Sequence, residues 1–382
     1  MYSVALKMLT GDRLKYFGLI AGIAFAAMLI VQQASILVGL TRQTGAFIRD
    51  TAQADLWVMD PQVRFSQDQV PLRSTVLQRV RGTDGVDWAV PLYQGFNRGH
   101  MPDGTSFTLI LVGIDDATMI GAPPQMELGK FADLRRDKAI FIDGDTAATK
   151  LMMKRGGGRA IRLGDRFTIN DQEVVATGAY RGRESFFWEP VIYTTYSRAL
   201  TLSSSDHNTM SFVLVKIRPG QDIRAVQKNL VDRTGLKVLT NDQFIDVTAD
   251  YILKATGILV NFGLAVILGV VIGSLVAGQT FYNFTLDNLR HYGALKAMGV
   301  SDGTLARMVW LQAGTVAVLG YGIGVGMGSI IGWGLRAGGL AFSMPWQIPA
   351  FAFASIISVC ALAAWLSLRR VFKLEPAVVF RG

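Results

Sequence analysis

Two short patterns in the sequence have the residue types of known catalytic loops, but neither has the surroundings that the chemistry requires. Gly299–Gly303 matches the Gly-x-Ser-x-Gly pattern of a serine nucleophile, which needs a strand before it and a helix after it. The residues before Gly299 have helical spacing, so we interpret the match as chance. Arg155–Arg159 (Arg-Gly-Gly-Gly-Arg) lacks the Lys-Ser/Thr ending of a phosphate-binding loop, and we interpret it as a flexible basic loop.

Residues that commonly bind metals or form disulfides are few and scattered. The three histidines, His100, His207 and His291, fit no metal-ligand spacing, and Cys360 lies inside an apolar run, where we expect it to pack. The segment 41–254 contains no cysteine and therefore no disulfide. The chain also lacks the Gly-x-x-x-x-Gly-Lys-Ser/Thr pattern of a phosphate-loop ATPase. We therefore predict no catalytic, metal-binding or cofactor-binding residues, and no enzymatic activity.

The polar residues with the most regular spacing lie in one charged interval, 281–307, between two long apolar runs. One face of a helix is formed there by residues three and four apart: Leu286, Leu289, Gly293 and Ala297. Asp287 and Arg290 can pair on the opposite face. Gly299 is expected to end this helix, and Ser301 to cap the next one. Periodicity leaves two alternatives open, a short amphipathic helix on a membrane surface and an ordinary solvated loop.

The elements around this interval are apolar runs long enough to cross a bilayer. Half of the 382 residues are hydrophobic and the mean hydropathy is positive, which is too apolar for an ordinary soluble enzyme. A transmembrane helix needs about 20 apolar residues. Four runs meet this length without an Asp or Glu, and we predict transmembrane helices at 17–40, 255–282, 309–335 and 346–368.

The net charge of +9 becomes informative when it is divided along the chain. The long segment 41–250 holds 26 basic and 25 acidic residues, so it is nearly neutral. The short segments 1–16, 283–308 and 369–382 are each positive. Basic residues are enriched in short cytoplasmic segments, so we predict that both termini and the 283–308 interval are cytoplasmic. The pI near 9.7 thus reflects membrane topology and does not indicate nucleic-acid binding.

The segment 41–254 is predicted to be a large α+β domain outside the cytoplasm, and 336–345 a short loop on the same side. Within 41–254, strands are expected at 55–59, 88–93, 107–113, 139–142, 166–169, 173–177 and 212–217. Helices are expected there at 74–81 and 223–234. Asn170-Asp171 is expected to form a hairpin turn, and Asp222 to cap the last helix. A change in amino-acid composition suggests a distal lobe, about 116–199, inserted into a basal lobe, about 41–115 and 200–254. The aromatic run Phe186-Phe187-Trp188 is either a partner contact or core packing.

Small and polar residues within the runs suggest contacts between helices. Glycines fall four apart on one face of the third run and again in the second run: Gly320, Gly324, Gly328 and Gly332, and Gly269 and Gly273. Such faces let helices approach closely in lipid, within one chain or across a dimer, and the same glycines could also serve as hinges. Gln32 and Gln33 in the first run either line a substrate path or form interhelical hydrogen bonds. The stretch 1–16 is either an amphipathic helix or a charged flank.

Three stretches resemble one family of transporters. His291–Gly299 (HYGALKAMG), preceded by Asp287 and Arg290, resembles the short cytoplasmic helix of ABC transporter permeases of the MacB/FtsX/LolC class. The C-terminal Glu375–Gly382 and the stretch Ala54–Met59 are similar to the DevC branch of that class. With the layout of the four runs, the resemblance covers the whole chain. It implies four transmembrane helices with a large α+β periplasmic domain between the first and the second.

The resemblance also implies a function and a set of partners. A DevC-like chain is the inner-membrane permease of an ATP-driven exporter of lipid-like or amphipathic cargo, paired with a second permease copy and with cytoplasmic ABC ATPases that use ATP and magnesium. MacB itself has a fused ATPase, whereas this chain has none, so a separate ATPase is expected. By resemblance, a periplasmic membrane-fusion adaptor and a TolC-like outer-membrane duct complete the path. ATPase coupling would fall to Asp287, Arg290, His291, Tyr292 and Lys296. The alternative is an FtsX-like regulator that transports nothing and acts on a cell-wall hydrolase.

Overall fold

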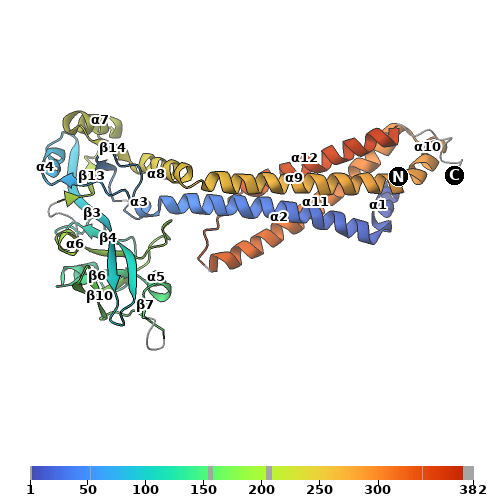
Figure 1. The fold of residues 1–382 in the computed structure, drawn as a ribbon. Helices are drawn as coiled ribbons and strands as arrows, with labels where there is room; N and C mark the ends of the chain where they lie inside the picture. The colour runs from blue at the N-terminus through green and yellow to red at the C-terminus, as the bar shows by residue number, and fades with distance from the viewer. Residues whose placement is uncertain (1, 52, 154–157, 204–208, 338, 373–382) are drawn as a thin grey trace. The chain divides into compact units, whose positions relative to one another are not determined.

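The computed structural model describes residues 2–51, 53–153, 158–203, 209–337 and 339–372 (Figure 1). Three sequence features lie outside these residues in whole or in part: the first residues of the Arg155–Arg159 loop, His207, and the C-terminal Glu375–Gly382. The chain divides into two compact units, one formed by Met1–Leu40 with Thr256–Gly382 and the other by Thr41–Ala255.

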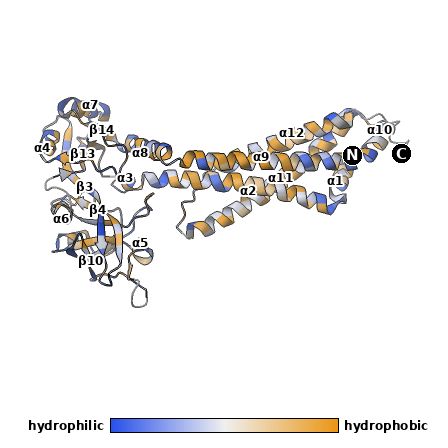
Figure 2. Cartoon of the chain, viewed as in Figure 1, coloured by the Kyte–Doolittle hydropathy of each residue, from blue (hydrophilic) through white to orange (hydrophobic). Residues whose placement is uncertain are grey.

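The first unit is a helical bundle, and the described residues contain four helices long and apolar enough to cross a membrane. They are α2 (Arg13–Thr44), α9 (Ile258–Asp287), α11 (Asp302–Ala337) and α12 (Gln347–Phe372). Figure 2 shows their predominantly hydrophobic colouring. The four predicted transmembrane runs are thus confirmed as long apolar helices, although the helix ends differ from the predicted ones by up to seven residues. The large α+β unit between the first and second of these helices is confirmed as well.

The stretch before the first long helix forms α1 (Tyr2–Gly11), as one of the two alternatives predicted. It buries Ala5 and Leu9 in the bundle core and leaves three apolar side chains exposed: Tyr2, Val4 and Leu6. The chain turns at Asp12, whose carboxylate accepts the backbone N–H of Lys15 at 3.2 Å and so caps the start of α2.

Glycines of α9 and α11 bring these helices against α2 within the same chain. A Cβ atom added to Gly273 would lie 2.7 Å from the Ala26 Cβ, and one added to Gly324 would lie 2.7 Å from the Ala27 Cβ and closer still to the Ala24 carbonyl oxygen. Only glycine therefore fits at these two positions without a shift of the neighbouring backbone.

The other predicted glycines divide into three groups. Gly320 is also tightly placed, with the Ile23 side chain 2.6 Å from an added Cβ. Gly269 and Gly328 have ordinary van der Waals room, and Gly332 faces the ring of Phe342 in the loop after α11. Gly322 and Gly326, also on α11, have no packing neighbour among the described residues within 4 Å of an added Cβ. The side chains of the half-buried Gln32 and Gln33 form no hydrogen bond with any residue that the structure describes.

The second unit begins with an antiparallel sheet whose strand order is β14 (Lys237–Thr240), β1 (Leu56–Met59), β13 (Phe212–Ile217) and the first half of β3 (Val86–His100). One side of it shares a hydrophobic cluster with α4 (Thr75–Arg81) and α7 (Ile223–Thr234). The other shares a cluster with α3 (Ala46–Asp50) and α8 (Asn241–Ala255). Trp57 lies fully buried there, its indole N–H donating to the Asn241 side chain at 2.6 Å.

The remaining strands form a second lobe that closes on itself. Around the ring, the second half of β3 pairs with β4 (Ser106–Ile114), then β11 (Val191–Thr195), β6 (Ala139–Asp143), β10 (Gln172–Tyr180) and β9 (Arg166–Ile169), which pairs back with β3. Closure removes the open sheet edges that favour aggregation. The smaller elements are β2 (Leu72–Arg73), β5 (Met126–Leu128), η1 (Phe131–Arg135), α5 (Gly144–Thr149), β7 (Met152–Met153), β8 (Arg159–Ala160), α6 (Tyr196–Leu202) and β12 (Thr209–Met210).

The local signals in this unit agree closely with the structure. Asn170 and Asp171 form the β9–β10 turn with φ of 45° and 63°, and the Asp222 carboxylate accepts two backbone N–H groups at the start of α7. The boundary of the second lobe differs from the predicted 116–199. The ring takes in β4 and half of β3, which we expected in the basal lobe, because one 15-residue strand changes partners midway.

The glycine contacts predict a position-specific effect. Gly324→Leu should destabilise the bundle by about 1–3 kcal/mol or more, because the added side chain meets backbone atoms of α2. Gly322→Leu is the matched control, since it lies on the same helix with open space around it. Thermal unfolding of the purified chain in detergent measures both variants. Equal losses of stability would contradict the packing role of Gly324.

Candidate functional site

The charged interval between the second and third long helices forms a short helix, α10 (Leu289–Ala297). Of the two alternatives, the helix is the one observed. It is separated from α9 by Asn288 alone, which leaves helical geometry with φ −92° and ψ 4°. The Asn288 side-chain amide donates to the Phe284 carbonyl oxygen at 2.9 Å and so partners a carbonyl near the break. The short helix α10 therefore continues α9 after a bend at a single residue, Asn288.

This break divides the helix face that we predicted. Tyr292 and Gly293 are buried, whereas Leu286 and Ala297 are exposed. The prediction of one continuous face from Leu286 to Ala297 is wrong, because Asn288 resets the helical phase between the two ends.

The same break separates the ion pair that we predicted between Asp287 and Arg290. Asp287 instead accepts from the Lys15 ammonium at 2.5 Å, and Lys15 also lies 3.3 Å from the Asp12 carboxylate. Lys15 stands at the start of α2 and is 272 positions from Asp287 in sequence, so helical spacing could not reveal the pair. Arg290 is exposed and forms no ion pair with any described residue.

The C-terminal end of α10 is a tight turn at Gly299. Gly299 adopts φ +87°, its N–H donates to the Lys296 carbonyl at 3.0 Å, and the Val300 N–H donates to the Leu295 carbonyl at 3.1 Å. These two bonds make a Schellman motif, which confirms the predicted role of Gly299 as the helix stop. Lys296 also pairs with Asp302 at 3.0 Å across the turn. Ser301 precedes α11, where its hydroxyl lies 3.0 Å from that of Thr304.

A chain of buried hydrogen bonds holds the middle of α10. The Tyr292 hydroxyl donates to the side-chain oxygen of Gln312 at 3.1 Å, and the Gln312 amide donates to the Ala5 carbonyl of α1 at 2.8 Å. Burial raises the pKa of Tyr292 to about 12, so the hydroxyl stays protonated as a donor. Tyr292, which the resemblance includes among the ATPase-coupling residues, is only 1% exposed and faces the bundle.

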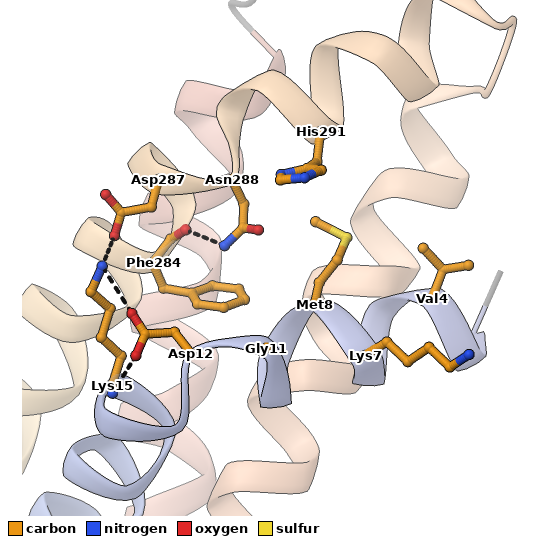
Figure 3. Close-up of a pocket in the computed structure, with 10 residues that line it drawn as sticks. All are labelled: Val4, Lys7, Met8, Gly11, Asp12, Lys15, Phe284, Asp287, Asn288 and His291. Carbon is orange, nitrogen blue, oxygen red and sulfur yellow. Dashed lines mark hydrogen bonds and ion pairs between the residues drawn. The ribbon is translucent and has the colours of Figure 1, made fainter.

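A pocket of about 440 Å³ lies between α1 and the bend from α9 to α10 (Figure 3). Its lining mixes apolar and charged side chains: Val4, Lys7, Met8, Gly11, Asp12, Lys15, Phe284, Asp287, Asn288 and His291. Within the described ranges, no three His, Cys, Asp or Glu residues are grouped so as to hold a metal. The arrangement offers exposed charge and shape for a partner. It offers no nucleophile paired with a base.

Three residues of this site were not predicted from the sequence, namely Lys15, Asn288 and Gln312. Gln312 carried a usable signal, because a polar side chain inside an apolar run usually faces protein. Lys15 and Asn288 carried none, since their roles depend on which helices lie side by side.

The aromatic run of the second unit lies in the loop between β10 and β11. The ring of Phe187 lies 6.0 Å from that of Phe65, 6.1 Å from Phe96 and 5.2 Å from Phe186. Trp188 is 48% exposed, has φ +54° and makes no ring contact with any described residue. Phe187 thus packs against its own chain, whereas Trp188 presents an unpartnered ring in a backbone conformation that is costly for a bulky side chain.

This contrast predicts opposite outcomes for neighbouring substitutions. Phe187→Ala should lower the free energy of unfolding by about 2 kcal/mol, because it removes a half-buried ring. Trp188→Asn should change it by less than about 0.5 kcal/mol, because Asn tolerates a positive φ and little contact is lost. Calorimetry of the two purified variants measures both. A large loss for Trp188→Asn would show that this ring is part of the core.

Two family models match the chain. The MacB-like periplasmic core domain matches residues 17–233, more than half of the chain, and the FtsX-like permease C-terminal domain matches residues 263–376. Two curated relatives, uncharacterised ABC transporter permeases of Mycobacterium tuberculosis and Mycobacterium bovis, are each 32% identical over 116 residues. These matches cover 29% of this chain and 31% of each relative, so the chain spans about a third of their length.

Two solved structures are similar to part of the chain. The extracellular domain of the noncanonic ABC-type transporter YknZ from Gram-positive bacteria covers 49% of this chain and 98% of its own, with 18% identity and a TM-score of 0.35. The periplasmic region of MacB from Actinobacillus actinomycetemcomitans covers 51% of this chain and 92% of its own, with 14% identity and a TM-score of 0.38. The assignment rests on the family models and on the four apolar helices. The chain belongs to the MacB/FtsX-like permease family.

Proposed function

We propose that the chain is the inner-membrane permease subunit of an ATP-driven ABC exporter and that α10 receives the movement of a separate cytoplasmic ATPase. The observation that carries this proposal is a short surface helix joined through one bent residue to a helix long enough to cross a membrane. Its exposed Arg290 and His291 are available to a partner. The resemblance of His291–Gly299 to the cytoplasmic helix of this family supports the same role.

The mechanism that we propose is mechanical coupling. ATP binding closes two ATPase subunits on two permease copies, and each α10 follows that closure. At 1.5 Å per residue, the 30 residues of α9 make a rod about 45 Å long, which can carry the displacement across a bilayer. The Schellman stop and the Lys296–Asp302 pair hold the far end of α10, so that it moves as one piece.

The remaining parts of the proposal rest on charge and resemblance. The positive short segments support cytoplasmic termini and a periplasmic α+β unit. The exposed Trp188 is a candidate contact for a membrane-fusion adaptor, with a TolC-like duct beyond it. Resemblance to the DevC branch supports lipid-like or amphipathic cargo. ATP and magnesium would be used by the ATPase, and none of the chain's own residues is assigned a catalytic or cofactor-binding role.

Purification of tagged chain from its native membrane in mild detergent, with mass spectrometry of the retained proteins, tests the proposal. We expect an ABC ATPase and a membrane-fusion adaptor. An ATPase with a cell-wall hydrolase would favour the regulator instead. Absence of any ATPase from an intact, folded chain would overturn the proposal.

Charge reversal on α10 tests the coupling itself. Arg290→Glu should lower activation of the ATPase by about tenfold, as loss of about 1.4 kcal/mol of interaction would, without changing the stability of the chain, because Arg290 has no partner among the described residues to lose. Arg218→Glu in the α+β unit makes the same charge change on an exposed residue and should have no effect. Lys296→Glu is less informative, since it also breaks the pair with Asp302. ATP hydrolysis by the reconstituted complex is the measurement, and wild-type activation by Arg290→Glu would exclude α10 as the contact.

A further inference from the structure

The N-terminal helix α1 is connected to α10 by a chain of hydrogen bonds between residues that are all buried. Ala5 is 0% exposed, and Gln312 and Tyr292 are each 1% exposed. Gln312 uses both ends of its amide, accepting from Tyr292 at 3.1 Å and donating to the Ala5 carbonyl at 2.8 Å. Apolar residues of α1, α10 and α11 surround this chain in one core.

Burial makes this chain difficult to break. A buried polar group that loses its partner keeps the cost of leaving water and gains nothing in return. If α10 moved away from α1, either the Tyr292 hydroxyl or one end of the Gln312 amide would be left without a partner. The movement that keeps every bond is one in which α1, α10 and the start of α11 move together.

A second contact joins the N-terminal segment to the other side of the Asn288 break. Lys15, at the start of α2, pairs with Asp287, the last residue of α9 (Figure 3). Both side chains are about half exposed, and such pairs contribute little to stability. This pair therefore orients the bend, whereas the buried chain fixes the distance between α1 and α10.

We propose that Gln312 is a positioning residue that holds α1 against α10, so that the two helices move together as one rigid body. Displacement of α10 then enters the membrane through two helices, α9 directly and α2 by way of α1. This inference rests on the proposed coupling function and adds to it a role for the N-terminal helix. Tyr2 and Leu6, exposed apolar side chains one turn apart on α1, suit a helix that slides along the membrane interface as it moves.

Spin labels on α1 and α10 test the proposal directly. Cysteines at Leu6 and Ala297, both exposed, are labelled in a chain whose buried Cys360 is replaced by Ala. Double electron–electron resonance gives the distance between the two spin labels in the complex with its ATPase, without nucleotide and with a non-hydrolysable ATP analogue. We expect one narrow distribution that is the same in both states. A shift between the two states would overturn the proposal.

The double variant Tyr292→Phe/Gln312→Leu separates positioning from stability. Gln312→Leu alone deprives both the Tyr292 hydroxyl and the Ala5 carbonyl of a partner, whereas the double variant deprives only the Ala5 carbonyl, so its thermal midpoint should be closer to wild type. The spin-label distance should nevertheless broaden, and activation of the ATPase should fall about fivefold or more, the lower range of coupling between sites. Tyr321→Phe is the matched control. Tyr321 is also on α11, and the change removes the hydrogen bond that its hydroxyl donates to the Pro349 carbonyl of α12. A double variant with wild-type distance and wild-type activation would contradict the inference.

The two proposals fail in different ways. If no ATPase is retained by the wild-type chain, the exporter function fails, and the distance in the nucleotide-free chain still reports whether Gln312 holds α1 against α10. If the ATPase is retained and activated while the double variant behaves as wild type, the positioning role alone is excluded.

Discussion

Close contact between α2 and its neighbours is the constraint on which the helical unit depends. Lipid tails are as apolar as leucine, so helices in a bilayer gain little from hydrophobic burial against one another and associate through tight packing and hydrogen bonds. Gly273 and Gly324 supply that packing by bringing α9 and α11 within van der Waals contact of α2 alanines. Residues of α1, α10 and α12 pack on the same core.

The cytoplasmic side of the unit, as we propose it, is held by polar contacts in place of glycines. Gln312 and Tyr292 are buried and fully partnered, while Lys15, Asp12 and Asp287 are exposed and paired. A partner that binds α10 therefore acts on a segment whose inner face is fixed and whose outer face still carries unpaired charge at Arg290. Rigidity toward the bundle and availability toward a partner are the two properties that a mechanical input needs, and they belong to opposite faces of one nine-residue helix.

The α+β unit solves a different physical problem, since it must be stable without disulfides. It does so with a fully buried aromatic cluster around Trp57, whose ring meets Phe212 and Phe244 at 5.4 Å each, and with a ring of strands that leaves few open edges. The long β3 belongs to both sheets, so the two lobes share one covalent strand. A unit built in this way can expose Trp188 on a loop while the core beneath it stays closed.

Features that depend on local chemistry could be predicted from the amino-acid sequence. Four apolar runs, the positive φ at Asn170 and Gly299, and the cap at Asp222 follow from composition and backbone preference over a few residues, and the structure contains all of them. Membership of the family was also accessible, because the motif at His291–Gly299 is continuous in sequence. Which charges pair, which face of α10 is buried and where the two lobes of the α+β unit divide depend on contacts between segments far apart in sequence. Asp287 meets Lys15 rather than Arg290, and Gln312 bridges α1 and α10, because helices distant in sequence lie side by side. Periodicity along one chain carries no information about such neighbours.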